Sequence, residues 1–260
     1  MKKFLMATIS MVLLLSIVFT VSACGQKKPV PETEGYELKI GYTLYKPMDY
    51  MENGELIGFD ADFGRKVCED LGYTAKFIEI DWNTKALSLK SGEIDLIWNG
   101  MTITEELKKE FLITQSYMEN QQVIVVKKEN ADKFKTVADL ANASSIVYED
   151  GSAADTLINE NVELNSVKKN EASAQKDAFL EVFAGTSEVA VVDVTMAKTM
   201  TEEGTDYGKT LVYVDVGFEK EEYGIAMRKV DTVLCEKING LIVEYQENGF
   251  FQKLYDKYMA

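Results

Sequence analysis

The chain has 260 residues, of which 46% are hydrophobic and 27% are charged, as expected of a globular protein with one large domain or two lobes. Its net charge of −15 at pH 7 argues against a nucleic-acid partner, because phosphates would repel it. The sequence contains no histidine, which excludes Ser-His-Asp and Cys-His catalysis and any zinc site that needs imidazole. We therefore predict a protein without a bound metal or cofactor.

The first residues have the pattern of a targeting segment. Lys2 and Lys3 precede an apolar stretch over residues 4–21, and small residues stand just before Cys24. This pattern predicts a signal peptide over residues 1–23. The alternative is a transmembrane anchor, since the apolar run approaches spanning length. The polar residues that follow Cys24 favour cleavage.

Residues 24–36 have the composition of a tether, because they are polar and contain two of the three prolines. The sequence Val21-Ser22-Ala23-Cys24 also resembles a bacterial lipobox. That resemblance implies a lipid on Cys24, and two acyl chains are enough for stable anchoring. We expect the body to lie on the extracellular face of the bacterial cell membrane, or in the periplasm if the cell has an outer membrane.

Apolar residues between 37 and 126 follow strand and helix periods in turn. Phe59, Phe63 and Val67 recur at helical spacing, and Gly92 marks the end of a second helix. Short apolar runs separated by helices predict a parallel sheet that is covered on both faces. The predicted strands are 37–43, 73–80, 94–98 and 121–126, and the predicted helices are 58–71 and 83–91.

The pattern restarts after residue 144, which predicts a second, similar α/β lobe. The predicted strands are 145–148, 162–167, 189–192 and 211–216. One predicted helix begins at 151–152, and three others cover 171–183, 230–246 and 250–258. Ligands of such folds bind between the lobes and at the carboxyl ends of strands. Cys68 and Cys235 lie in apolar helical stretches, which predicts buried free thiols, although an exported protein can form disulfides.

Several motifs resemble those of extracellular solute-binding proteins, family 3, the polar amino-acid receptors of ABC importers. The signature is Gly58-Phe59-Asp60-Ala61-Asp62-Phe63, and only Ala61 departs from it, because the family prefers a larger aliphatic residue there. The resemblance extends over residues 36–259. Further matches follow in family order at Asp81-Trp82, 91–97, 100–104, 116–118, 188–193 and 223–227.

This resemblance implies a two-lobed, periplasmic-binding-protein-like (type II) α/β fold. Each lobe is expected to be a mainly parallel sheet flanked by helices, and two crossover strands near 121–126 and 216–223 join them. Lobe 1 would comprise 37–122 plus 220–260, and lobe 2 would comprise 123–219. The implied function is to close on a small polar solute, an amino acid or a related amine, and to deliver it to a membrane permease. The protein is expected to be a monomer. The implied chemistry is binding and not catalysis.

Asp193 is the predicted partner of a ligand ammonium group. It ends an apolar strand and matches the family aspartate with that role, and a buried ligand charge needs such a partner. The alternative is an N-cap for a helix over 194–200, and the two roles are compatible.

The resemblance assigns three hydroxyl side chains to anion binding. Thr102 and Thr104 match the carboxylate-binding segment, and Thr102-Ile-Thr-Glu has the form of a capping box. Ser152 follows Gly151 in a loop where the family has Gly-Thr-Thr, so Ala153 removes one hydroxyl. Simple helix capping is the alternative explanation for all three.

Two aromatic residues, Tyr45 and Trp82, match the walls that enclose the ligand in the family, and such faces suit an apolar side chain or a cation. The alternative is that both are core aromatics. Asn99 and Gly100 are further candidate contacts at the end of a strand. Trp98 is expected in the core, and Asp49 is expected to be solvated near the mouth of the cleft.

Leu107 stands where the family usually has an arginine that binds the ligand carboxylate. Lys108 cannot replace that arginine, because one helical residue turns the side chain by about 100°. Arg65 and Arg228, the only arginines, match no ligand position. Three alternatives stay open: the ligand lacks an α-carboxylate, backbone amides and hydroxyls bind it, or a lysine substitutes.

Two other classes of function compete with that of a receptor. Some relatives of the fold are dehydratases of cyclic carboxylic acids, which would need a general acid such as Asp193. A sensor module that reports ligand occupancy to a separate signalling partner is the other alternative.

Overall fold

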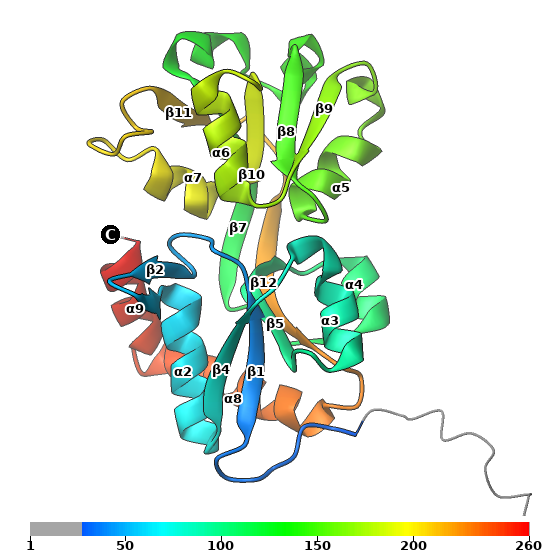
Figure 1. Cartoon of the computed structure of the whole chain (residues 1–260), viewed down its shortest axis with the longest axis vertical. Helices are drawn as coiled ribbons and strands as arrows, with labels where there is room; N and C mark the ends of the chain where they lie inside the picture. Colours follow the sequence, from blue (N-terminus) through cyan, green and yellow to red (C-terminus); the bar gives the residue numbers. More distant parts are fainter. Residues whose placement is uncertain (1–27, 260) are drawn as a thin grey trace, which may run out of the picture.

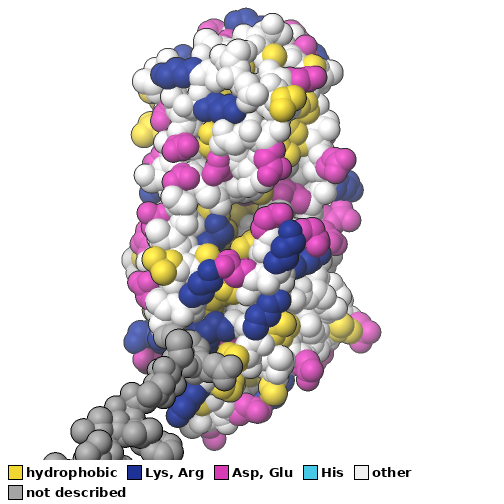
Figure 2. All heavy atoms as spheres, turned by 90° about the vertical axis from the view of Figure 1, so that its right-hand side faces the viewer, with side chains coloured by type: hydrophobic (Ala, Val, Ile, Leu, Met, Phe, Trp, Pro, Cys, Tyr) yellow, Lys and Arg dark blue, Asp and Glu magenta, His cyan; other side chains and the backbone are white. Residues whose placement is uncertain are grey.

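The computed structural model describes residues 28–259, so the predicted signal peptide and Cys24 lie outside the described residues. Two α/β lobes lie end to end and are joined by two strands, as predicted from the resemblance (Figure 1). On the face drawn in Figure 2, acidic and basic side chains are interspersed over both lobes. Within residues 28–259 there is no helix with the length and apolar character needed to span a membrane.

The sheet of the first lobe has the strand order β4-β1-β5-β12. Strand β1 pairs in parallel with β4 and β5, and β12 pairs antiparallel with β5. The strands are β1 (Glu37–Tyr42), β4 (Thr74–Glu79), β5 (Leu96–Thr102), β6 (Leu112–Ile113) and β12 (Lys220–Met227), beside a hairpin of β2 (Tyr50–Glu52) and β3 (Glu55–Ile57). The helices are α2 (Phe59–Leu71), η1 (Trp82–Thr84), α3 (Lys85–Ser91), α4 (Glu105–Glu110), α8 (Thr232–Glu247) and α9 (Phe250–Tyr258).

The sheet of the second lobe has the order β7-β10-β8-β9, with β11 on the other side of β7. Strands β10, β8 and β9 are mutually parallel, whereas β7 and β11 run antiparallel to their neighbours. The strands are β7 (Met118–Lys127), β8 (Ser145–Glu149), β9 (Lys168–Ala172), β10 (Val189–Asp193) and β11 (Leu211–Val214). The helices are η2 (Lys128–Lys133), η3 (Val137–Asn142), α5 (Ala153–Glu160), η4 (Val162–Leu164), α6 (Gln175–Ala184) and α7 (Val194–Met200).

Strands β7 and β12 connect the lobes. Residues 118–121 of β7 pair with 220–223 of β12, and residues 122–125 of β7 then pair with β10. Strand β7 therefore leaves one sheet and enters the other between Gln121 and Gln122. We propose that the lobes are divided here, along the predicted boundaries 37–122 plus 220–260 and 123–219.

The core of the first lobe is aromatic and forms around α2. Phe63 lies edge-on to Trp98, with ring centroids 4.6 Å apart, and also contacts Phe251 of α9 at 4.9 Å. The C-terminal helices thus return to cover the first lobe, and Trp98 is a core residue, as predicted. Cys68 and Cys235 are buried free thiols, which confirms that prediction.

The strand predicted over 162–167 is wrong. This segment begins as the short helix η4, because the Asn161 side chain accepts a hydrogen bond from the Glu163 amide and starts a turn. Leu164 and Val167, three residues apart, are both buried, so a helical period was mistaken for a strand. The actual strand is β9, whose polar sequence Lys-Lys-Asn-Glu-Ala pairs only with β8 at the edge of the sheet. The predicted helix 171–183 accordingly starts only at Gln175.

Part of the predicted tether packs on the body. Val30 is 8% exposed and belongs to the core of the first lobe, and its amide donates a hydrogen bond to Asp231 Oδ1 at 2.7 Å. Gly35 donates a backbone hydrogen bond to the Gly72 carbonyl. The prediction that residues 24–36 are not part of the core is therefore wrong at Val30, because Asp231 provides an acceptor that composition does not reveal.

Candidate functional site

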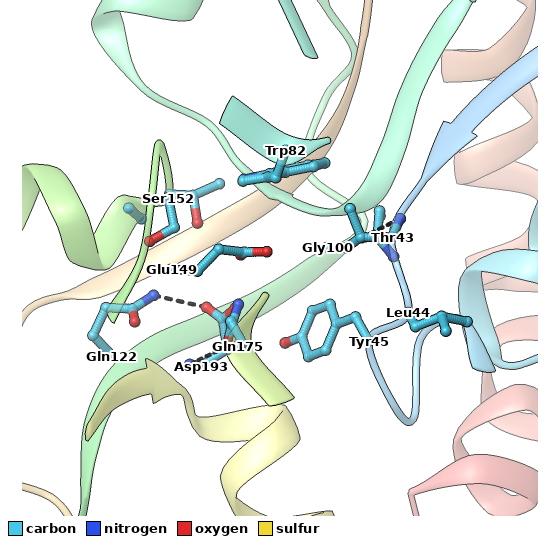
Figure 3. Close-up of a pocket in the computed structure, with 13 residues that line it drawn as sticks. Thr43, Leu44, Tyr45, Trp82, Gly100, Gln122, Glu149, Ser152, Gln175 and Asp193 are labelled. Atoms are coloured by element: carbon cyan, nitrogen blue, oxygen red, sulfur yellow. Dashed lines mark hydrogen bonds between the residues drawn. The ribbon is translucent and has the colours of Figure 1, made fainter. Parts of the chain in front are cut away.

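A pocket lies between the lobes, where the carboxyl ends of β1, β5, β8 and β10 meet (Figure 3). Parallel strands bring side chains at their carboxyl ends to one edge of a sheet, so distant segments of the chain converge here. Seven of the eight predicted ligand-binding residues line this pocket, and Thr104 does not. The lining residues are Thr43, Leu44, Tyr45, Trp82, Asn99, Gly100, Thr102, Gln122, Glu149, Ser152, Ala153, Gln175 and Asp193.

The two lobes touch across the mouth of the pocket. The side-chain amide of Asn83 in the first lobe donates to the Asp150 carboxylate of the second, and Lys85 Nζ donates to the Gly151 carbonyl at 2.7 Å. Gly151 has φ of 70°, and a Cβ there would lie 2.9 Å from Asn83 Cα. The glycine allows this close approach, and the contacts across the mouth show that the described conformation is a closed one.

Asp193 ends β10 and is held by three amide side chains. Its carboxylate accepts a hydrogen bond from Gln122 Nε2 at 2.7 Å and further hydrogen bonds from the side-chain nitrogens of Asn120 and Gln175. Burial raises the pKa of Asp193, and the amide donors oppose this rise. Asp193 occupies the N-cap position of α7 but its side chain makes no capping hydrogen bond, so the predicted capping role is wrong. The carboxylate is turned to the amides instead.

Glu149 is a site residue that the sequence analysis missed. It ends β8, is only 4% exposed, and its carboxylate points into the pocket between Trp82 and Asp193 (Figure 3). No described residue donates a hydrogen bond to this carboxylate. Burial and the nearby Asp193 charge raise the pKa of Glu149 to about 8, although Lys85 opposes the rise. The available signal was an acid at the end of an apolar strand, the same feature that singled out Asp193.

A third carboxylate, Glu221 of β12, lies behind the amides. Its Oε1 accepts hydrogen bonds from Gln122 Nε2 at 2.5 Å and Asn120 Nδ2 at 3.1 Å, so both amides bridge Glu221 and Asp193. Burial and the Asp193 charge raise the pKa of Glu221 to about 7. Because the crossover strands supply Asn120, Gln122 and Glu221, the site is built partly from the connection between the lobes.

The predicted anion-binding threonines have different positions. Thr102 ends β5 and lines the pocket, whereas Thr104 lines an adjoining hollow together with Lys85 and Leu107. Thr104 is the N-cap of α4 and accepts a hydrogen bond from the Leu107 amide at 3.2 Å. The predicted capping box from Thr102 is wrong, because the helix starts at Glu105 and Leu107 takes the place of the reciprocal acid.

Ser152 and Gly151 form the loop that precedes α5. Ser152 Oγ accepts a hydrogen bond from the Asp155 amide at 3.2 Å, so it is the helix N-cap, and it also lines the pocket. The helix-capping explanation is thus correct for Ser152, and the residue lines the pocket as well.

The aromatic residues form the wall of the pocket on the first lobe. Trp82 is 7% exposed, and Lys85 Nζ lies 4.8 Å from the centroid of its ring. The Tyr45 hydroxyl lies 2.7 Å from that of Tyr223, within hydrogen-bonding distance. Gly100 makes room for this wall, because a Cβ there would lie 2.6 Å from the Tyr45 ring.

Asn99 supports the pocket from below. Its Oδ1 accepts hydrogen bonds from the amide and hydroxyl of Thr43, at 3.1 and 2.6 Å, and its Nδ2 donates to Asp49 Oδ2 at 2.7 Å. Asp49 is 0% exposed, so the prediction that it is solvated is wrong. Burial and the neighbouring Asp60 raise the pKa of Asp49 well above its ordinary value. Asp60 in turn accepts from the Gly100 amide at 2.7 Å, which holds the pocket loop in place.

The arginines lie elsewhere, as predicted. Arg228 is buried in the first lobe, where it pairs with Asp95 at 2.9 Å and Asp231 at 3.1 Å. Arg65 pairs with Asp62 on α2. Among the described residues that line the pocket there are two carboxylates, Glu149 and Asp193, and no lysine or arginine.

Two α/β lobes that close on a buried polar pocket define the class of solute-binding proteins. The model of the bacterial extracellular solute-binding proteins, family 3, matches residues 38–260, and the chain belongs to this family. This confirms the expected family and fold, and the chain is accordingly the substrate-binding component of an ABC importer.

The comparisons include two arginine-binding relatives. The arginine-binding extracellular protein ArtP of Bacillus subtilis is 27% identical, over 100% of this chain and 99% of that protein. The L-arginine-binding protein of Pseudomonas aeruginosa is 32% identical, over 80% of this chain and 81% of that protein.

Two solved structures show the same fold. An ancestral arginine-binding protein bound to arginine has a TM-score of 0.81 and 32% identity, and covers 88% of this chain and 100% of its own. An ancestral amino-acid-binding protein described as a precursor of cyclohexadienyl dehydratase has a TM-score of 0.79 and 30% identity, and covers 86% of this chain and 96% of its own.

Proposed function

We propose that this protein closes its lobes on a small cationic solute, an amino acid or a related amine, and delivers it to a membrane permease. The observation that carries the proposal is the closed acidic pocket, in which Asp193 is held by three amides and none of the described lining side chains is cationic. A buried carboxylate needs a charge partner, and a ligand ammonium group supplies one. The relatives named for arginine binding support a cationic ligand.

In this proposal the seven predicted contact residues that line the pocket have four different tasks. Asp193 binds the ammonium group, Trp82 and Tyr45 enclose the ligand, and Ser152 and Thr102 offer hydroxyl groups. Gly100 and Asn99 shape the floor of the pocket, because their own polar groups are already bonded to Asp60, Thr43 and Asp49.

The test is a thermal-shift screen of the purified protein against the common L-amino acids and their decarboxylated amines. A ligand that binds only the folded state stabilises it by mass action, by about 2.7 kcal/mol at a hundredfold excess over Kd, and therefore raises Tm. A shift with any cationic compound supports the proposal. If cations give no shift and a neutral or anionic solute does, the proposed ligand class is wrong.

We also propose that Cys24 carries the lipid anchor and that the mature protein is a monomer on the extracellular face of the membrane. The support is the lipobox-like sequence before Cys24 and the family to which the chain belongs. Metabolic labelling with a fatty-acid analogue should mark the wild type and leave Cys24→Ala unlabelled. Sedimentation of the delipidated protein should give the mass of one chain.

A second candidate function is dehydration of a cyclic carboxylic acid. It is favoured by Glu149, a buried pocket carboxyl with a pKa raised to about 8 and therefore able to act as a general acid, and by the solved precursor of a dehydratase. Incubation with cyclohexadienyl carboxylic acids, followed by product analysis, tests it. Absence of turnover at high protein concentration would exclude this second function and leave only that of a receptor.

A further inference from the structure

The charges of the pocket do not match a zwitterionic ligand. Glu149 and Asp193 line it, Glu221 lies behind them, and no lysine or arginine is among the described lining residues. An α-amino acid brings a carboxylate together with its ammonium group. That carboxylate would enter a poorly solvated space that already holds these acids, which is unfavourable unless a cationic partner meets it.

Glu149 differs from the other two acids in its hydrogen bonds, although the charge of Lys85, which lies outside the pocket lining, acts on it. Asp193 has three amide donors and Glu221 has two, whereas no described residue donates to Glu149, which is 4% exposed and aimed into the pocket (Figure 3). A buried carboxylate without a hydrogen bond is costly. The missing partner is therefore expected from the ligand, and the donor it provides is cationic or at least a strong N–H donor.

Among the described residues no arginine faces a ligand carboxylate and the nearest lysine is already engaged, so the pocket offers it only neutral groups such as the Ser152 hydroxyl. Leu107 cannot form an ion pair, and it packs against the apolar cluster that contains Trp82. Lys85 Nζ already donates to the carbonyls of Trp82, at 3.1 Å, and Gly151, at 2.7 Å. Lys85 thus contributes to closure of the lobes, and it leaves the positive charge of the pocket to the ligand.

We infer that the pocket is built for an organic cation without a carboxylate, an aliphatic amine or a guanidinium compound, and selects against the α-amino acid with the same side chain. In this arrangement Asp193 and Glu149 receive the cationic groups and the face of Trp82 covers them. The inference rests on the proposed function and narrows its ligand class. It assigns Glu149 as a specificity-determining residue.

The deciding experiment is calorimetry with matched pairs that differ by one carboxylate. The pairs are putrescine and L-ornithine, cadaverine and L-lysine, and agmatine and L-arginine. We expect at least one amine to bind about tenfold or more tightly than its amino acid. If amino acids bind as well as or better than their amines, this inference is overturned while the proposed function stands. If none of the six compounds binds, this inference fails, and the thermal-shift screen decides the proposed function separately.

Two substitutions separate the role of Glu149 from a general effect of charge. Glu149→Gln should weaken amine binding by about tenfold or more, since it removes a buried charge partner. Glu163→Gln makes the same change of charge at an exposed position of the second lobe and should leave affinity unchanged. Equal affinities of Glu149→Gln and the wild type would overturn the assignment. The melting temperature of each variant checks folding, and loss of an unpartnered buried charge should not lower it.

Two further substitutions test the site of the absent arginine. Leu107→Arg should improve binding of the amino-acid member of a pair relative to its amine, because the guanidinium supplies the missing bidentate partner. Lys85→Met tests the competing idea that Lys85 binds the carboxylate. If the wild type prefers an amino acid to its amine and Lys85→Met loses this preference, Lys85 has the role of the arginine and the inference is wrong.

Discussion

The two walls of the pocket differ in kind. The first lobe contributes uncharged groups, Tyr45, Trp82 and Asn99, whose positions are held by hydrogen bonds and packing within that lobe. The second lobe contributes the acids Glu149 and Asp193. The difference indicates that the first lobe offers uncharged contacts and that the second lobe recognises charge. Closure is then what brings the two kinds of recognition onto one ligand.

The largest loss is expected for Asp193→Ala, which removes the charged centre of the second lobe. Loss of one partner of a buried charge pair costs about 2–5 kcal/mol, so binding should weaken by at least about thirtyfold. Calorimetry with the compound that gives the largest thermal shift measures this. The isosteric Asp193→Asn controls for packing and should also bind poorly; unchanged affinity of either variant would place the cationic site elsewhere.

A smaller loss is expected on the first lobe for Trp82→Ala. Cation–π contacts contribute about 0.5–2 kcal/mol, so we expect a weakening of about three- to thirtyfold. Trp82→Phe keeps an aromatic face and should recover most of the affinity. Equal effects of the two substitutions would show that the size of the tryptophan, and not its π face, matters.

The contact between the lobes can be broken at Gly151. In Gly151→Ala the new Cβ would lie 2.9 Å from Asn83 Cα, so closure should be hindered and binding weakened by about tenfold. Gly204→Ala is the matched control, because Gly204 also has a positive φ, of 98°, but nothing lies within 4 Å of its Cβ position. Small-angle scattering with saturating ligand should show a more open molecule only for Gly151→Ala.

The smallest expected effect is that of pH on stability. It tests the acids of the second lobe without a change in the shape of the lobe. Burial raises the pKa of Glu149 to about 8 and that of Glu221 to about 7, with Asp193, Asp177, Asp81 and Lys85 also acting on Glu149. Because the folded state holds these protons more tightly than the unfolded state, stability of the ligand-free protein should fall as pH rises from about 5 to about 8.

Ligand binding should show the opposite dependence. An amine stays protonated over this range and favours ionised carboxylates, so its affinity should rise with pH. Melting curves and calorimetry between about pH 5.5 and about pH 8.5 test both signs, and each 1 kcal/mol of stability moves Tm by about 2–4 °C. Glu149→Gln should flatten both profiles. Profiles that do not change in this variant would show that other buried acids, such as Asp49 and Asp60, dominate.

Local patterns were sufficient for most elements of the fold. The helix α9 and the strand β10 lie close to where apolar spacing predicts them, because their periodic residues are buried against one neighbouring layer. Strand β9 was missed because its partner β8, and not its own polar sequence, makes it a strand. The helix η4 was misassigned for the related reason that Leu164 and Val167 suit either period.

The amino-acid sequence by itself determined the family, the two lobes, the free thiols and the main candidates Asp193, Trp82 and Tyr45, since these depend on motifs and on periods within one segment. Only the tertiary structure decided which acids have partners. Asp193 receives amides from β7 and α6, Asp49 is buried beneath Asn99, and Glu149 is left without a donor. Hydrogen-bond partners and burial depend on segments that are far apart along the chain, so no local pattern distinguishes a satisfied carboxylate from one that waits for a ligand.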